Sequence, residues 1–376
     1  MTVVNVLVFA GILIVLVLLH EAGHLIVAKW CGMRVERFSV FFGKPIWSFR
    51  RGETEYGFGW LPLGGYVKIT GMTREELVNR VYDPETGALV AEIPEPPEVQ
   101  ARAYCNASTS RRIATIFAGP AANIIVAVIA FAISFWIGIP QFGNNDVVRV
   151  VTSGSPAQTA DLRAGDRILS INGVRSQDGD PTPLRDVLQR NPGKSVTVVV
   201  ARGGETVTIV TPKLVTDPNN PSIGRLGFQF GERQVGQLQF GPGAGLREAV
   251  QYTGFLTKEQ VKALGRLFVD EKTRSEVSSV VGIGATYNDI AGTGAGTVFR
   301  FIGILSLILA IMNLLPLLPL DGGHIVFALA EKIRGRPLPI AAFQRASTVG
   351  IVIVAFFFLY ALNNDIARFT GQGFKP

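Results

Sequence analysis

Long stretches without charged side chains constrain the fold of this chain more than any other feature. Residues 3–19, 113–139 and 301–320 carry no charge, and residues 347–364 form a shorter, aromatic-rich run. A helix needs about 20 apolar residues to cross a bilayer. The first three runs reach that length once the first is continued to Val27, whereas the fourth is marginal. The sequence therefore predicts a polytopic α-helical membrane protein with about four transmembrane helices.

The distribution of basic residues supports a membrane protein and argues against a nucleic-acid partner. Only 17% of the residues are charged, against about 25% in a soluble domain. The formal net charge is +7, but much of the basicity lies near the ends of the apolar runs, at Lys29, Arg34, Arg37, Arg111, Arg112, Lys332, Arg334 and Arg336. The positive-inside rule then predicts that loops 28–112 and 331–346 face the cytoplasm and that segment 140–298 lies outside.

All three histidines lie at the expected inner ends of two apolar runs. His20 and His24 bracket Glu21 in the sequence HEAGH. A helix places residues four apart on one face, where two imidazoles can bind one metal ion, and Glu21 can act as general base toward a bound water. Hydrolytic zinc takes three protein ligands. Asp321 is the best candidate for the third, because an acidic side chain at membrane depth is costly and normally functional.

Simpler roles are also open for several residues near these motifs. Asp321 could cap a helix or form a turn with the next glycine. His324 could be a metal ligand, a pH-sensitive group or a residue that contacts the ligands rather than the metal, and we favour the last. Asn313 could cap a broken helix or bind an unwound substrate. Asn123 could line the site and bind substrate. Gly119–Pro120 before it could simply begin the second helix, and the small residues there favour close packing against the first helix.

The two histidine motifs together resemble those of the site-2 protease family of intramembrane zinc metalloproteases. HEAGH stands in a first span and NLLPLLPLDGGH in a later one. AGPAAN at 118–123 is similar to the family's GPxxN element, and GWLPLGGYVKITGM at 59–72 resembles its cytoplasmic-side hairpin. Residues 147–211 resemble an extracytoplasmic α+β PDZ domain.

The resemblance implies a zinc ion held by His20, His24 and Asp321, with Glu21 as the catalytic acid and base. It also implies that Asn313 lies near the substrate backbone. The expected substrates are single-span membrane proteins already trimmed by another protease. The expected location is a bacterial inner membrane, with the active site near its cytoplasmic face.

Three departures from the family pattern leave substrate selection open. One PDZ domain is recognisable, where some members carry two in tandem. The loop 73–108 is longer than usual and rich in proline and glutamate. SVVGI at 279–283 stands where many members have Gly-Pro before Val-Gly-Ile.

The segments around the site have alternative interpretations. Residues 38–69 predict a small membrane-associated antiparallel sheet, which could be structural or could pair with an unwound substrate. In the PDZ-like region, Gly203–Gly204 predicts a hairpin, and GRLGFQF at 224–230 resembles a carboxylate-binding loop although it follows the body of the domain. The domain could bind a peptide or ectodomain, or only exclude bulky substrates. The amphipathic stretch 246–269 could lie on the membrane surface or against the PDZ domain.

The expected organisation, in chain order, is as follows. It comprises transmembrane helix 1 (1–30), a cytoplasmic-side loop with β-hairpins (31–112), transmembrane helix 2 (113–139), the PDZ domain (140–230), an amphipathic linker (231–298), transmembrane helix 3 ending in LDGGH (299–324), a second cytoplasmic-side loop (325–346), transmembrane helix 4 (347–364) and an extracytoplasmic tail (365–376).

Three other functions compete with the protease. A catalytically silent membrane adaptor would bind no metal and would be insensitive to Glu21→Gln. A transporter that uses intramembrane histidines and carboxylates would be expected to show internal repeats, and none is evident. A tethered protease acting on soluble chains would place its ligands outside the bilayer, whereas HEAGH lies in an apolar run.

Overall fold

The computed structural model describes residues 2–82, 89–217, 220–267 and 269–370. Within these residues, four helices are long and apolar enough to cross a membrane: α1 (Val3–Trp30), α3 (Thr109–Ile137), α9 (Ala295–Asn313) and α11 (Ile340–Thr370). The chain divides into two compact units, Met1–Ile139 with Gln239–Pro376 and Pro140–Leu238. The expected tail is partly helical, since α11 continues to Thr370, and residues 371–376 lie outside the described part.

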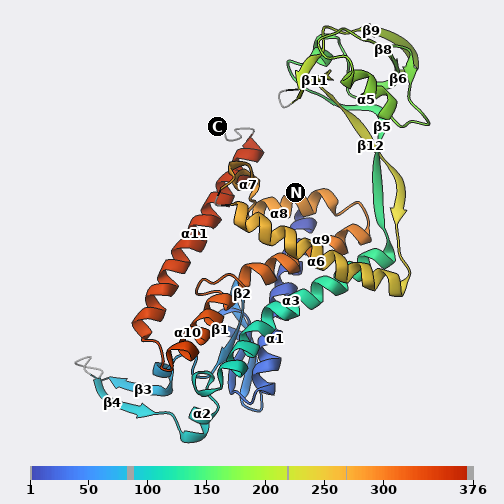
Figure 1. The fold of residues 1–376 in the computed structure, drawn as a ribbon. Coiled ribbons are helices and arrows are strands. Elements are labelled where there is room, and N and C mark those ends of the chain that lie inside the picture. Colours follow the sequence, from blue (N-terminus) through green and yellow to red (C-terminus); the bar gives the residue numbers. More distant parts are fainter. Residues whose placement is uncertain (1, 83–88, 218–219, 268, 371–376) are drawn as a thin grey trace. The chain divides into compact units, whose positions relative to one another are not determined.

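Helix α3 is the centre of the helical unit, where it packs against α1, α9, α6 (Pro242–Arg266) and α10 (Asp321–Arg334) (Figure 1). Small residues allow this close packing. A Cβ atom added at Gly23 of α1 would collide with the backbone carbonyl of Ala118, and one added at Gly303 of α9 would collide with the Phe131 ring. Helices in lipid associate through such close contacts, because apolar surface gains little by leaving lipid for another helix.

The start of α3 differs from the sequence prediction. The helix begins at Thr109, and Pro120 lies in its interior rather than in its first turn. The interpretation of Gly119–Pro120 as a helix start was therefore wrong. Transmembrane helices tolerate such a proline because neighbouring groups can satisfy the carbonyl it leaves free.

The third apolar run is divided into two helices. Helix α9 ends at Asn313, and α10 begins at Asp321 after a turn that contains the cis peptide bond Leu318–Pro319. Gly322 has no room for a side chain, because a Cβ atom there would meet the carbonyls of Leu314 and Leu315. The turn thus folds closely onto the first residues of α10 and fixes where that helix starts.

Two antiparallel hairpins precede α3. β1 (Val35–Arg51) pairs with β2 (Thr54–Ile69), and β3 (Val78–Tyr82) pairs with β4 (Leu89–Pro94). The first pair confirms the sheet predicted for residues 38–69 and extends it. Its aromatic side chains are unusually exposed, with Trp47 at 63% and Trp60 at 60%, as suits a surface in contact with lipid headgroups.

The Pro140–Leu238 unit is built on one sheet with the strand order β12-β5-β6-β8-β9. The strands are β5 (Ile139–Val151), β6 (Arg167–Ile171), β8 (Thr197–Arg202), β9 (Glu205–Val210) and β12 (Phe228–Leu238), with short β7 (Val174–Arg175) beside β6. Two helices, α4 (Pro156–Thr159) and α5 (Thr182–Gln189), and a hairpin of β10 (Val215–Asp217) with β11 (Asn220–Arg225) complete it. The pairing of Arg202 with Glu205 confirms the hairpin predicted at Gly203–Gly204.

A buried ion pair fastens a turn of this unit to the sheet. Asp166 accepts hydrogen bonds of 2.7 Å from both Nε and Nη2 of Arg202, and one of 2.8 Å from the backbone N–H of Arg163. Burial raises the pKa of the Asp166 carboxyl, but these hydrogen bonds outweigh it and hold the pKa below its ordinary value. The turn after α4 is thereby held against β8.

The predicted amphipathic stretch forms helix α6 and belongs to the helical unit. Its inner face packs on α3 through Ala249, Tyr252 and Leu256. Its outer face leaves Val250 and Phe255 more than half exposed. The buried partner of this stretch is a candidate membrane helix. Short helices α7 (Glu271–Glu276) and α8 (Val280–Ile290) follow.

Candidate metal centre

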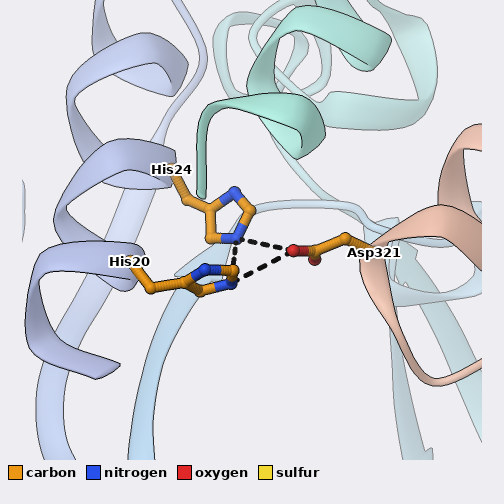
Figure 2. A group of neighbouring side chains, drawn as sticks. All are labelled: His20, His24 and Asp321. Atoms are coloured by element: carbon orange, nitrogen blue, oxygen red, sulfur yellow. Dashed lines mark hydrogen bonds and ion pairs between the residues drawn. The ribbon is translucent and has the colours of Figure 1, made fainter. Parts of the chain in front are cut away.

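Two helices far apart in the sequence bring three potential ligands together. His20 and His24 lie one turn apart on α1 and face Asp321, the first residue of α10 (Figure 2). The Nε2 atoms of the two histidines are 3.2 Å apart, and they lie 3.1 Å (His20) and 3.4 Å (His24) from Oδ2 of Asp321. Both histidines are only 7% exposed. The site is therefore compact and largely closed to solvent.

The spacing of these atoms fits a tetrahedral zinc ion. Zinc bonds of about 2.0–2.2 Å at tetrahedral angles separate neighbouring ligand atoms by about 3.3–3.5 Å, close to the three observed distances. Oδ2 of Asp321 is buried and accepts no hydrogen bond from the part of the chain that the structure describes, which is costly for a carboxylate unless a cation satisfies it. Two imidazoles and one carboxylate form a common ligand set of catalytic zinc. The residues present thus fit the ion.

The second nitrogen of His24 is held by the backbone of α3. Its Nδ1 atom lies 2.9 Å from the carbonyl oxygen of Thr115. A carbonyl can only accept, so Nδ1 carries the proton and Nε2 keeps its lone pair. A hydrogen bond of this kind fixes the ring orientation of a metal-binding histidine. Sequence reasoning missed this contact, because every residue has a carbonyl group and Thr115 offers no side-chain signal.

Gly119 of α3 lies directly against both imidazole rings. A Cβ atom at this position would collide with Nε2 of His24 and would stand 2.8 Å from Cε1 of His20. The helix can therefore support the two rings only if residue 119 is glycine. Its small size is compatible with close helix packing, but nothing in the sequence places it in the metal site.

Glu21 follows His20 on α1 and lies beside the β1–β2 hairpin. Its Cγ atom would be 3.2 Å from a Cβ atom added at Gly65 of β2. The side chain is partly buried. The residue between the two histidines in HEAGH that can act as a base thus lies close to a strand of the hairpin.

Of the other predicted site residues, Asn123 contacts a candidate ligand, whereas Asn313 and His324 make contacts elsewhere. Asn123 is fully buried, and its Nδ2 atom lies 3.3 Å from Nδ1 of His20. Asn313 is partly exposed at the end of α9, where its amide donates to the carbonyl of Leu309 at 3.0 Å. His324 contacts Phe343, with ring centroids 5.5 Å apart and the ring planes tilted by 54°, and lines a cavity of about 330 Å³.

Four helices long and apolar enough to cross a membrane, together with a His–His–Asp cluster that could hold a metal ion, are the features of a multi-pass membrane protein with a candidate hydrolase-type metal centre. Known proteins agree with this class. The model of peptidase family M50 matches residues 8–357. The chain therefore belongs to family M50, the site-2 protease family, and is a zinc metalloprotease.

Individual relatives match over nearly the whole chain. Zinc metalloprotease Rip1 of Mycobacterium tuberculosis is 30% identical, over 98% of both chains. Atu1380 of Agrobacterium fabrum, whose name provisionally describes a zinc metalloprotease, is 30% identical over 96% of both. Among solved structures, the PDZ domain of an SdrC-like protein from Listeria monocytogenes matches 23% of this chain and 87% of its own. Its identity is 21% and its TM-score 0.20, which carries no argument for the fold.

Proposed function

We propose that this protein is an intramembrane endopeptidase in which His20, His24 and Asp321 hold the zinc ion. The observation that supports this most directly is that the three ligand atoms lie within 4.8 Å of one another, although Asp321 comes 297 positions after His24 in the sequence (321 − 24). A bound zinc ion supplies a Lewis acid and an acidified water. The residues around it position the substrate and move protons.

Glu21 is the proposed acid and base. Its carboxylate takes a proton from the attacking water and returns it to the amine of the leaving strand, so that proton transfer balances over one cycle. The lack of a side chain at Gly65 leaves room for Glu21, so that its Cγ atom lies beside β2. An unwound substrate segment pairing with the hairpin would then lie close to both Glu21 and the ion. Asn313, at the end of the broken helix, is the proposed contact to the substrate backbone.

The proposed substrates are single-span membrane proteins already shortened by another protease. Ligands at the end of a membrane helix can reach only a segment that enters the bilayer, and a helical substrate must unwind to expose its peptide bonds. Basic residues near the helix ends support a bacterial inner-membrane location. They also support a cytoplasmic position for the site and an extracytoplasmic position for the Pro140–Leu238 unit.

Substitution of the carboxylate ligand tests this assignment. Asp321→Ala should lower zinc content and cleavage of a model single-span peptide together, by about 100-fold or more in cleavage, because the ion loses its anionic ligand and gains no substitute. Asp289→Ala in α8 is a suitable control, since Asp289 is not in the ligand cluster. Metal analysis of the purified proteins is paired with the peptide assay. Full zinc content and normal cleavage in Asp321→Ala would refute the site.

The Pro140–Leu238 unit is proposed to be a PDZ domain that binds extended chain ends. The GRLGFQF segment, which follows the body of the domain in sequence, enters β12 at one edge of the sheet. Leu226, Gly227 and Phe228 line a cavity of about 600 Å³ together with Arg185 and Leu188 of α5. A sheet edge beside a cavity suits strand addition, and the cation of Arg185 suits a terminal carboxylate.

Charge reversal in this cavity separates peptide binding from simple exclusion of bulky ectodomains. Arg185→Glu in the full chain should weaken binding of peptides with a free carboxyl terminus about tenfold, since it replaces attraction by repulsion. The same peptides with an amidated end should be little affected. Arg190→Glu, at the end of the same helix but outside the cavity lining, is the matched control. Equal binding of free and amidated peptides would contradict the assignment and favour exclusion.

A further inference from the structure

One face of α3 is arranged to contact both imidazoles of the site. Thr115, Gly119 and Asn123 are spaced four apart, so they lie on the same side of the helix. Thr115 contacts His24 through its carbonyl, Gly119 touches both rings, and Asn123 reaches His20. Helix α3 therefore offers each histidine one polar group, and the polar group at His20 is a side chain.

Zinc binding determines which ring nitrogen of His20 carries the proton. For Nε2 of His20 to offer a lone pair to the ion, Nδ1 must carry the proton of the neutral ring. A protonated Nδ1 is a donor and needs an acceptor. The amide nitrogen Nδ2 of Asn123, which lies 3.3 Å from Nδ1 of His20, is also a donor. In that orientation two donors would face each other at the ligand.

The other end of the same amide is left without a partner. Oδ1 of Asn123 is buried and accepts no hydrogen bond within the described residues. The oxygen and nitrogen of an asparagine amide have nearly the same shape, and the hydrogen-bond network decides which occupies which place. Rotating the amide by half a turn presents Oδ1 to Nδ1 of His20 and removes the conflict between donors.

We propose that Asn123 is a positioning residue of the zinc site, whose Oδ1 atom accepts the Nδ1 proton of His20 and thereby directs Nε2 to the ion. This role deepens the proposed function and rests on its assignment of His20 as a ligand. It differs from the expected role in substrate binding, because Asn123 has no exposed surface. Asn123 acts on catalysis only through the histidine.

The backbone at this position is also held in place. The hydroxyl of Ser306 on α9 donates to the carbonyl of Asn123 at 2.8 Å, and both residues are fully buried. This bond joins α9 to the segment of α3 that contacts the histidines. The side chain of Asn123 is therefore presented to His20 from a fixed position, as an orienting group requires.

Two substitutions at Asn123 distinguish an acceptor from a packing residue. Asn123→Leu keeps a similar volume but has no acceptor, and zinc affinity should fall about 10–100-fold. Asn123→Asp has an acceptor and cannot donate when ionised, so zinc affinity should stay within about threefold of the wild-type value or exceed it. The measurement is competition for Zn²⁺ against a chelator of known affinity, with the purified full chain. Ser134→Ala, which removes a buried hydrogen bond of 2.6 Å from α3 to the carbonyl of Gly296 on α9 but contacts neither histidine, is the matched control and should change zinc affinity less than about threefold.

The outcomes separate this inference from the proposed function. Zinc affinity that falls in Asn123→Leu but not in Asn123→Asp supports the acceptor role, because a packing role would favour leucine over a buried carboxylate. Normal affinity in Asn123→Leu, or a loss in Asn123→Asp as large as that in Asn123→Leu, overturns the inference while leaving zinc binding by the wild type intact. Failure of the wild type and of His20→Ala to differ in affinity would instead refute the ligand assignment itself.

Discussion

Glu21→Gln is expected to retain zinc and to lose nearly all proteolysis. Glutamine has the shape of glutamate but cannot accept a proton at neutral pH, so the attacking water loses its base and the leaving amine loses its acid. General acid–base catalysis contributes about 10²–10⁴-fold, and we expect cleavage of a single-span peptide to fall within that range. Zinc remains because the ligand cluster consists of His20, His24 and Asp321.

A matched substitution shows whether the effect is specific to the position. Glu259 lies on α6, where it pairs with Lys262 at 2.8 Å in an exposed setting. Glu259→Gln should leave zinc content and cleavage near the wild-type level, because exposed ion pairs contribute little. Zinc is measured by metal analysis and cleavage by product formation from the same preparation. Cleavage by Glu21→Gln at the wild-type rate would remove Glu21 from the mechanism, and loss of zinc in that variant would assign it a different role.

Gly119→Ala is expected to disable the metal site with the addition of a single methyl group. The new Cβ atom would overlap Nε2 of His24, the atom proposed to face the ion, and would crowd Cε1 of His20. Either the rings turn away or α3 separates from α1. Because ligands must be held within about 0.5 Å of productive geometry, we expect zinc affinity to fall about 100-fold or more, with a corresponding loss of cleavage.

A second glycine-to-alanine change provides the control. Gly11 lies on α1, and a Cβ atom added there would have no neighbour within 4 Å. Gly11→Ala should therefore preserve zinc binding and cleavage, and alanine is at least as compatible with the helix. Circular dichroism of both variants checks that the helices are retained. Full zinc content in Gly119→Ala would show that α3 does not press on the rings as the structure places it.

Gly119 illustrates why parts of the site could not be predicted from the sequence. A ligand is chosen by its chemistry, so histidines four apart in a helix and an aspartate at membrane depth are visible in the sequence. A supporting residue is chosen by what lies opposite it. Gly119 and the carbonyl of Thr115 contact the histidines only because α3 lies against α1. Neither offers a side-chain group that would suggest a metal centre.

The region before Asp321 shows a similar division. Pro316 and Pro319 disfavour a continuous helix, and both lie in the break between α9 and α10. They did not indicate that α9 ends at Asn313 and that Asp321 begins a separate helix. The close contact of Gly322 with the carbonyls of Leu314 and Leu315 fixes that boundary, and this contact depends on the three-dimensional path of the turn. The pairing of β12 with β5 was also not predicted, because it joins strands that are far apart in the sequence.

The sequence by itself determined the membrane class, the helical spacing of His20 and His24, and the identity of Asp321 as the candidate third ligand. Each follows from a local rule: lipid excludes charge, a helix repeats every 3.6 residues, and a buried carboxylate needs a cation. Only the tertiary structure decided that three ligand atoms meet within 4.8 Å and that α3 supports the two imidazoles. The physical reason is that contacts between distant segments depend on how helices pack, and packing is a property of surfaces that no single segment contains.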